Sequence, residues 1–365
     1  MSRARPRHRA CPMTIGNCDA AEIVVYMSYH YRRVSAMRAV VPAYSIFHQK
    51  NIFVVLTYRC NAFCQKCITR YNRFRDQSMQ NEDCVRLANL FVENHYAGTI
   101  NMGSGESLLH SELPNFVDRI LNGSPNVSFR ILSNGKLFSF LLPKVLFDPR
   151  VNWGITLDGF CNADLVGLQQ GVDIDVVKKN IESVCNAGFS GNLYLNYTLN
   201  RQNVNSLKAY IDFACGLGIP DLYVTEMKVF KKFENLDRYR ISAKDREMAI
   251  EMLEYAKTLP FRTVGSDLDR DLTLPRKCFK RKENVSPIID LNGMVTFCSG
   301  QEDAFIGNVF DPNTLSKWND MFEKMISDAH ASVKWCSRCF AKIDNDGYFS
   351  VPLSLNPYLQ ERCCV

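Results

Sequence analysis

Six segments with the composition of buried β-strands alternate with helix-like segments, and this alternation constrains the fold more than any other feature of the chain. The strand-like segments are rich in β-branched and aromatic residues and cover residues 52–57, 99–102, 127–132, 151–157, 193–199 and 221–225. Helical apolar spacing is found in residues 82–96, 113–121, 172–187 and 204–217. Repeated β/α segments form a parallel sheet with right-handed crossovers, so the sequence predicts an α/β fold, a partial (β/α)6 barrel of the TIM type.

Three cysteines lie close together directly after the first predicted strand. Cys60, Cys64 and Cys67 have the spacing C-x3-C-x2-C. Each iron corner of a cubane iron–sulfur cluster usually takes one thiolate, so three thiolates hold three irons of a [4Fe–4S] cluster and leave the fourth open to a ligand that is not protein. Spacing alone leaves two alternatives open, because the chain has 15 cysteines: chance clustering, or part of a zinc site.

Polar residues and glycines follow the later strands, at the end of the sheet where parallel barrels keep their sites. The candidates for a binding role are Gly103, Ser104, Gly105 and Glu106 after the second strand, Ser133 and Asn134 after the third, Thr156 and Asp158 after the fourth, and Asn196 in the fifth. Asn-Gly and Asp-Gly pairs are also common in ordinary turns at strand ends. The alternative interpretation is therefore that these loops are plain turns without a binding role. No catalytic side chain is identified; Glu226 and Cys161 are the candidates.

A second set of cysteines lies near the C-terminus, at Cys278, Cys298, Cys336 and Cys339. Alternating apolar residues around Asn292-Gly293 predict a tight β-hairpin, followed by a helix over residues 315–329. Four thiolates complete either a [4Fe–4S] cluster without an open corner or a structural zinc site. Whether Cys363 and Cys364 add a ligand stays open.

Composition excludes several classes of function. The chain of 365 residues is 46% hydrophobic and 22% charged, as soluble globular proteins are, and has no apolar run long enough to span a membrane. It also lacks a secretory signal, so cysteines at metal-ligand spacing indicate a reducing cytoplasm. The net charge of +6 is too small to indicate nucleic-acid binding. We therefore expect neither a nucleic-acid nor a membrane partner.

The cysteine loop and the polar loops after it resemble those of the radical S-adenosylmethionine (SAM) enzymes. That family has C-x3-C-x2-C after the first barrel strand, and G-G-E-P, Ser/Thr-Asn-Gly and S-L-D-G elements after the next three. The corresponding elements here are Ser104-Gly105-Glu106-Ser107, Ser133-Asn134-Gly135 and Thr156-Leu157-Asp158-Gly159. The family usually has an aromatic residue before the third cysteine, in contact with adenine, where this chain has Lys66. The C-terminal cysteines resemble the Twitch form of the SPASM subfamily.

The resemblance implies two cofactor sites and a partner. One [4Fe–4S] cluster is held by Cys60, Cys64 and Cys67 and binds SAM, with contacts from the polar residues named above, Gly103 to Asn196. An auxiliary [4Fe–4S] cluster is held by the four C-terminal cysteines. One electron, from a flavodoxin- or ferredoxin-type donor, splits SAM into methionine and a 5′-deoxyadenosyl radical that abstracts hydrogen from a substrate.

The implied division of the chain has four parts. Residues 1–48 are a basic extension, partly disordered or upstream of the natural start, and residues 49–265 are the core barrel. Residues 266–345 form a small auxiliary-cluster domain, with the β-hairpin and a helix, and residues 346–365 are a tail.

Three functions stay open at this point. A small substrate is favoured, and basic clusters such as Lys228, Lys231 and Lys232 favour an anionic one, converted by dehydrogenation or rearrangement with the auxiliary cluster as electron acceptor. The alternative within the family is a maturase that modifies a ribosomally made peptide. An iron–sulfur electron carrier or a zinc-stapled binding protein is the alternative of another class.

Overall fold

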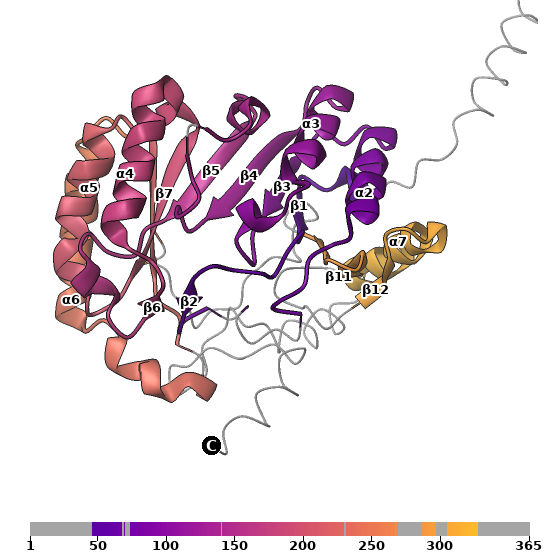
Figure 1. Cartoon of the computed structure of the whole chain (residues 1–365). Coiled ribbons are helices and arrows are strands. Elements are labelled where there is room, and N and C mark those ends of the chain that lie inside the picture. The colour runs from indigo at the N-terminus through magenta and orange to yellow at the C-terminus, as the bar shows by residue number, and fades with distance from the viewer. Residues whose placement is uncertain are drawn as a thin grey trace, which may run out of the picture. The chain divides into compact units, whose positions relative to one another are not determined.

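The structure, a computed structural model, describes residues 46–67, 69, 74–139, 141–229, 231–266, 268, 286–296 and 305–327. Strands and helices alternate from Asn51 to Ser266, as the sequence predicts (Figure 1). The strands of this part are β1 (Asn51–Val54), β3 (Thr99–Met102), β4 (Ser128–Ser133), β5 (Val151–Thr156), β7 (Leu193–Leu199), β8 (Asp221–Glu226) and β9 (Thr263–Ser266). The helices are α2 (Asn81–Glu93), α3 (Leu113–Gly123), α4 (Ile174–Val184), α5 (Leu207–Gly216) and α6 (Ala243–Lys257).

These strands form one mostly parallel sheet. The order is β12-β11-β10-β1-β3-β4-β5-β7-β8-β9, and the run from β10 (Ile288–Ile289) to β9 is parallel throughout. Among the described residues the sheet is open, with β9 at one edge and β12 (Phe305–Asn308) at the other. The predicted α/β fold with a partial barrel is confirmed. All six predicted strands are present, and β9 and β10 extend the parallel run beyond them.

Amphipathic helices cover the convex side of the curved sheet (Figure 1). On α2 the buried residues Cys84, Leu87, Ala88 and Phe91 recur at the three- and four-residue spacing of one helical face. Phe91 meets the ring of Phe116 on α3 edge to face, with centroids 6.4 Å apart. Burial of such a side chain contributes about 1.5–3 kcal/mol, so this shared core holds α2 and α3 together.

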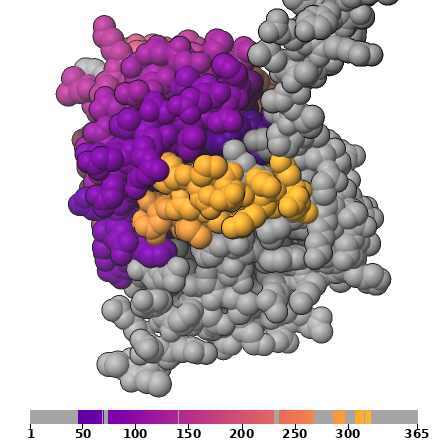
Figure 2. Space-filling view, turned by 90° about the vertical axis from the view of Figure 1, so that its right-hand side faces the viewer, coloured from indigo at the N-terminus to yellow at the C-terminus, as the bar shows by residue number. Residues whose placement is uncertain are grey.

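The predicted hairpin is confirmed. β10 pairs antiparallel with β11 (Met294–Thr296), and Gly293 in the turn has a φ of +75°, which favours glycine. β12 and α7 (Pro312–Ser327) follow. Figure 2 shows this orange-to-yellow segment against the indigo and purple part of the chain. The Arg86 guanidinium of α2 lies 4.2 Å from the centre of the Phe310 ring, so the two parts are in contact.

The remaining predicted segments lie largely outside the described residues. These are most of residues 1–48, the tail 346–365, and all six C-terminal cysteines, Cys278, Cys298, Cys336, Cys339, Cys363 and Cys364. The four-part division and the second ligand set therefore stay predictions. In the part of the chain that is described, no helix has the length and apolar content to cross a bilayer.

Candidate active site

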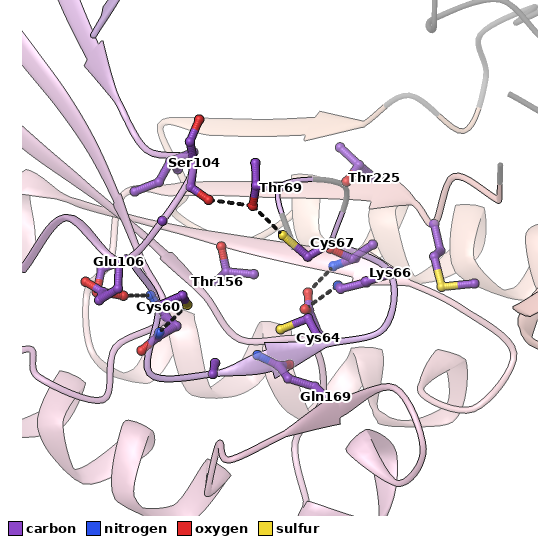
Figure 3. A pocket seen from close by; sticks show the side chains of 18 of the residues that line it. Cys60, Cys64, Lys66, Cys67, Thr69, Ser104, Glu106, Thr156, Gln169 and Thr225 are labelled. Carbon is purple, nitrogen blue, oxygen red and sulfur yellow. Dashed lines mark hydrogen bonds and ion pairs between the residues drawn. The ribbon is translucent and has the colours of Figure 1, made fainter. Parts of the chain in front are cut away.

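The loop after β1 brings Cys60, Cys64 and Cys67 to the wall of one cavity of about 490 Å³. The Cys67 backbone N–H donates to the Cys64 carbonyl over 3.1 Å, which makes the x2 spacing a tight turn. Cys60 is exposed, and the other two are half-buried. Figure 3 shows the three sulfur atoms around the same space, each on a separate part of the loop. Thiols arranged in this way are suited to bind different irons of one cluster.

Two contacts fix this loop from outside. At its base, Thr57 forms an antiparallel bridge with Ser78, and their hydroxyl oxygens lie 2.7 Å apart. Beyond it, β2 (Phe63–Cys64) pairs antiparallel with β6 (Gln169–Gln170), which belongs to the segment after β5. The backbone, and not only side chains, therefore sets where Cys64 lies.

Two of the thiols, those of Cys60 and Cys64, are held neutral in the absence of metal. Burial raises the pKa of Cys64 to about 12, against a lowering effect of the Lys66 ammonium, and desolvation of its sulfur raises the pKa of Cys60 although that residue as a whole is exposed. A bound iron favours the thiolate and reverses this effect. In the described ranges, no three His, Cys, Asp or Glu side chains are grouped closely enough for a single metal ion. The donor chemistry, three thiols on separate parts of one loop, fits a cluster whose ligands are spread over several irons.

The loop after β3 packs directly on the cysteine loop through Gly105. Its N–H donates to the Thr57 carbonyl over 3.1 Å, and the next N–H, of Glu106, donates to the Arg59 carbonyl over 2.8 Å. A Cβ at position 105 would lie 2.4 Å from the Arg59 oxygen. Only glycine permits this approach, which explains why the second glycine of the predicted element is present.

Ser104 stands where the resembled element has its first glycine, and its φ of +84° lies in the left-handed region. The hydroxyl of Thr69 donates to the Ser104 carbonyl over 2.6 Å and lies 2.8 Å from the Cys67 sulfur. Thr69 thus connects the cysteine loop to the glycine loop (Figure 3). No sequence motif pointed to it.

Glu106 joins three loops at the bottom of the site. Its buried carboxylate accepts from the Ser133 hydroxyl at 2.9 Å, the Asn134 N–H at 2.8 Å and the Leu108 N–H at 3.2 Å. Burial raises the pKa of Glu106, and these hydrogen bonds oppose the shift. Asn134 in turn donates to the Asn61 side chain over 2.8 Å. The predicted residues after the second and third strands therefore hold the loops together.

Lys66 and Asp158 form an ion pair inside the cavity wall. The carboxylate is 4% exposed and the lysine side chain 13% exposed. The second carboxylate oxygen accepts from the Thr198 N–H over 2.8 Å at the end of β7. The residue that departs from the family's aromatic position thus has a specific partner, Asp158, in the loop after β5.

Most predicted site residues line this one cavity. They are Cys60, Cys64, Cys67, Ser104, Gly105, Glu106, Ser133, Asn134, Thr156, Asp158 and Glu226. Three do not: Gly103, Asn196 and the exposed Cys161. Asn196 instead accepts the Leu157 N–H with its backbone carbonyl. Lining residues that the sequence did not indicate are Ala62, Thr69, Leu132, Gln169, Thr198, Thr225 and Met227.

Glu226 closes the cavity on the β8 side. Its carboxylate pairs with the Arg246 guanidinium of α6 at 2.5 Å, and Arg246 also donates to the Leu268 carbonyl over 2.9 Å. Because Arg246 holds this carboxylate in place, Glu226 is better suited to form part of the cavity wall than to accept a proton. Both candidate catalytic residues stay predictions.

Comparisons with known proteins agree with this geometry. Residues 54–214 match the model of the radical SAM superfamily. A protein of Sulfurisphaera tokodaii named probable GTP 3′,8-cyclase is 26% identical over 215 residues, which are 56% of this chain and just under two thirds (66%) of that relative.

Two solved structures share the fold. Streptococcus suis SuiB bound to the precursor peptide SuiA has a TM-score of 0.60 and 15% identity, over 94% of this chain and 82% of that one. The structure of anSMEcpe with bound AdoMet and Cp18Cys peptide has a TM-score of 0.58 and 14% identity, over 85% and 96%. At these identities the likeness concerns the fold alone.

Proposed function

Because residues 54–214 place this chain in the radical SAM superfamily, as an enzyme of that class, we propose that its 490 Å³ cavity is the site of SAM cleavage. Cys60, Cys64 and Cys67 hold a [4Fe–4S] cluster, and SAM lies against the loops after β3, β4 and β5. When bound, the cluster and SAM supply a one-electron cleavage and a 5′-deoxyadenosyl radical that takes a hydrogen atom from the substrate.

The convergence of three cysteines and of the ends of β3, β4, β5, β7 and β8 on one cavity carries this proposal. The backbone around Gly105 lies against the cysteine loop, where close approach of carbonyl groups suits the ammonium end of SAM. Glu106 holds the loops without facing solvent. Asp158 and Thr156 line the same cavity. These residues orient a ligand and keep water away from a reactive species.

The substrate is proposed to be small and anionic. Lys228 lines the β8 side of the cavity, so a cation stands where a substrate would enter beside SAM. The name of the Sulfurisphaera tokodaii relative refers to GTP, a small anion, which supports this choice. A peptide substrate is the second candidate, because both fold neighbours were determined with peptides.

Further parts of the proposal concern residues outside the described ranges. Cys278, Cys298, Cys336 and Cys339 hold an auxiliary [4Fe–4S] cluster in a domain over residues 266–345, with zinc as the alternative. A flavodoxin- or ferredoxin-type donor in the cytoplasm supplies the electron.

The test is iron and acid-labile sulfide per chain after anaerobic purification and reconstitution. The proposal expects about eight irons in the natural protein and about four after Cys60, Cys64 and Cys67 are all changed to Ala. A control with Cys84, Cys185 and Cys215 changed to Ala keeps all eight, because these cysteines lie outside the cavity lining. About four irons with one zinc would make the C-terminal set structural. The proposal is contradicted if the reconstituted natural protein holds little iron, or if it forms no 5′-deoxyadenosine under strong reductant.

A further inference from the structure

Gln169 is a buried side chain in the cavity wall whose amide oxygen has no hydrogen-bond partner among the described residues. It is 6% exposed, and its amide oxygen Oε1 is buried without a hydrogen-bond partner among the residues that the structure describes. Buried side-chain amides are nearly always bonded, so such a group indicates a missing partner. Gln169 lines the cavity, so a rotation of its side-chain amide can bring this oxygen to a ligand bound there.

The strand pairing aims this amide at the cluster loop. Gln169 on β6 lies opposite Cys64 on β2, and directly paired residues of an antiparallel ladder project to the same side. Both line the cavity, as does Lys66, two residues after Cys64. Figure 3 shows Gln169 next to Cys64 on the wall below the cysteine sulfurs. The amide is therefore beside the predicted cluster and not in a remote part of the cavity.

The hydrogen-bonding groups of a carboxamide indicate which part of SAM Gln169 can bind. A carboxamide is neutral and presents a donor and an acceptor side by side, and rotation of its last bond exchanges the two. The ammonium, carboxylate and sulfonium groups of SAM carry charge, whereas its adenine edge carries an amino donor beside a ring-nitrogen acceptor. Glutamine forms a pair of hydrogen bonds with that edge in protein–DNA complexes.

We propose that Gln169 is the residue that reads the adenine edge of SAM in this chain. The inference rests on the proposed function. Lys66, at the position before the third cysteine, is engaged with Asp158 and offers no aromatic face to a base. Gln169, on the strand paired with the cysteine loop, thus selects adenine through hydrogen bonds, because Lys66 has no aromatic ring on which the base could stack.

The first test compares two ligands on the natural, iron-loaded protein. One is S-adenosylhomocysteine, which is not cleaved, and the other is its analogue with hydrogen in place of the 6-amino group. Their dissociation constants are measured by anaerobic calorimetry. We expect the analogue to bind about tenfold more weakly, the effect of one to two lost hydrogen bonds. Equal affinity of the natural protein for both ligands overturns the inference without any variant.

The second test repeats the comparison in Gln169→Met, which keeps the length of the side chain and removes the amide. The preference for the amino ligand should fall to about one, as in a double-mutant cycle. Gln170→Met is the matched control, because the neighbouring side chain is exposed and paired with Phe63. It should keep the tenfold preference.

Iron content per chain and the visible spectrum are recorded for each protein. A preference that persists in iron-loaded Gln169→Met overturns the inference, while failure of the natural protein to bind iron or S-adenosylhomocysteine overturns the proposed function instead.

Discussion

At the scale of single residues, Lys66 carries a positive charge into a largely buried wall, and the carboxylate of Asp158 neutralises it. Lys66→Met removes the cation and leaves a carboxylate that is 4% exposed and accepts a hydrogen bond from the Thr198 N–H. Loss of one member of a buried pair typically costs about 3–5 kcal/mol, and the 13% exposure of Lys66 places this one at or below the lower end. Urea unfolding of iron-free protein measures the loss.

The double variant Lys66→Met, Asp158→Asn separates loss of the pair from loss of packing. It removes the buried charge as well, so it should be more stable than Lys66→Met alone. A double variant as unstable as the sum of the two single variants would contradict a specific pair.

Gly105 is the residue whose replacement should separate the two loops of the site. In Gly105→Ala the new Cβ meets backbone at 2.4 Å, which no rotamer change relieves. We expect a loss of at least about 2 kcal/mol in unfolding free energy and less than half of the iron at the Cys60 site. Gly103→Ala in the same loop is the control, because its nearest contact is a leucine side-chain atom at 3.2 Å. Equal iron in both variants would show that close packing at Gly105 is not needed.

The sequence predicted residues that line the cavity better than it predicted their contacts. Cys60, Cys64, Cys67, Glu106, Ser133, Asn134 and Asp158 were predicted because each follows a predicted strand at a motif position, and all of them line the cavity. The Lys66–Asp158 pair could not be predicted, since it joins positions 92 residues apart whose contact depends on sheet curvature. Gln169 left a weak signal, the segment Gly167-Leu168-Gln169-Gln170-Gly171, in which two glycines bound a very short strand.

At the scale of elements, α6 links a helix cap to the cavity. Its N-terminus is a capping box: the Ser242 hydroxyl accepts the Asp245 N–H, and the Asp245 carboxylate accepts the Ser242 N–H. The next residue, Arg246, holds Glu226 at the cavity wall. Fraying of this end of α6 would therefore release Glu226.

This cap gives a dependence on pH with a definite sign. The Ser242 backbone N–H, and then its hydroxyl, lower the pKa of Asp245 from its ordinary value of 3.8. Stabilisation by the ionised carboxylate is therefore present above that value and is lost as the pH falls through the lowered pKa. Asp245→Asn should cost about 0.5–1 kcal/mol at pH 7 and progressively less below pH 3.8. Urea midpoints of both proteins from pH 7 to 3 measure this difference, and a constant difference would rule out the ionised cap.

At the scale of the whole molecule, the sequence predicted the repeated β/α segments well. It did not predict that the first strand of these repeats pairs with a strand near the C-terminus. Long strands such as β7 (Leu193–Leu199) were located from their apolar residues alone. β10 has only two residues, Ile288 and Ile289. Its parallel partner β1 lies over 230 positions earlier in the chain, so no local sequence pattern predicts that the two strands pair. β10, which lies within the predicted auxiliary domain, is thus a strand of the core sheet.

A continuous sheet has a consequence for unfolding. The Phe53 N–H donates to the Pro287 carbonyl over 2.8 Å and the Val55 N–H to the Ile289 carbonyl over 2.9 Å, so loss of β10 exposes the backbone of a buried strand. We therefore expect the core and the segment from β10 to α7 to unfold in one transition, although the sequence divides them at residue 265.

Tryptophan fluorescence tests this directly, because the chain has three tryptophans in different parts. Trp153 is fully buried in β5 and Trp318 is fully buried in α7. One variant with Trp318 and Trp335 changed to Phe reports on the core, and one with Trp153 and Trp335 changed reports on α7. In each, the urea midpoint from fluorescence should coincide with that from far-ultraviolet circular dichroism, as cooperative unfolding requires. An earlier transition at Trp318 alone would mean that the C-terminal segment is a separate domain that docks on β1.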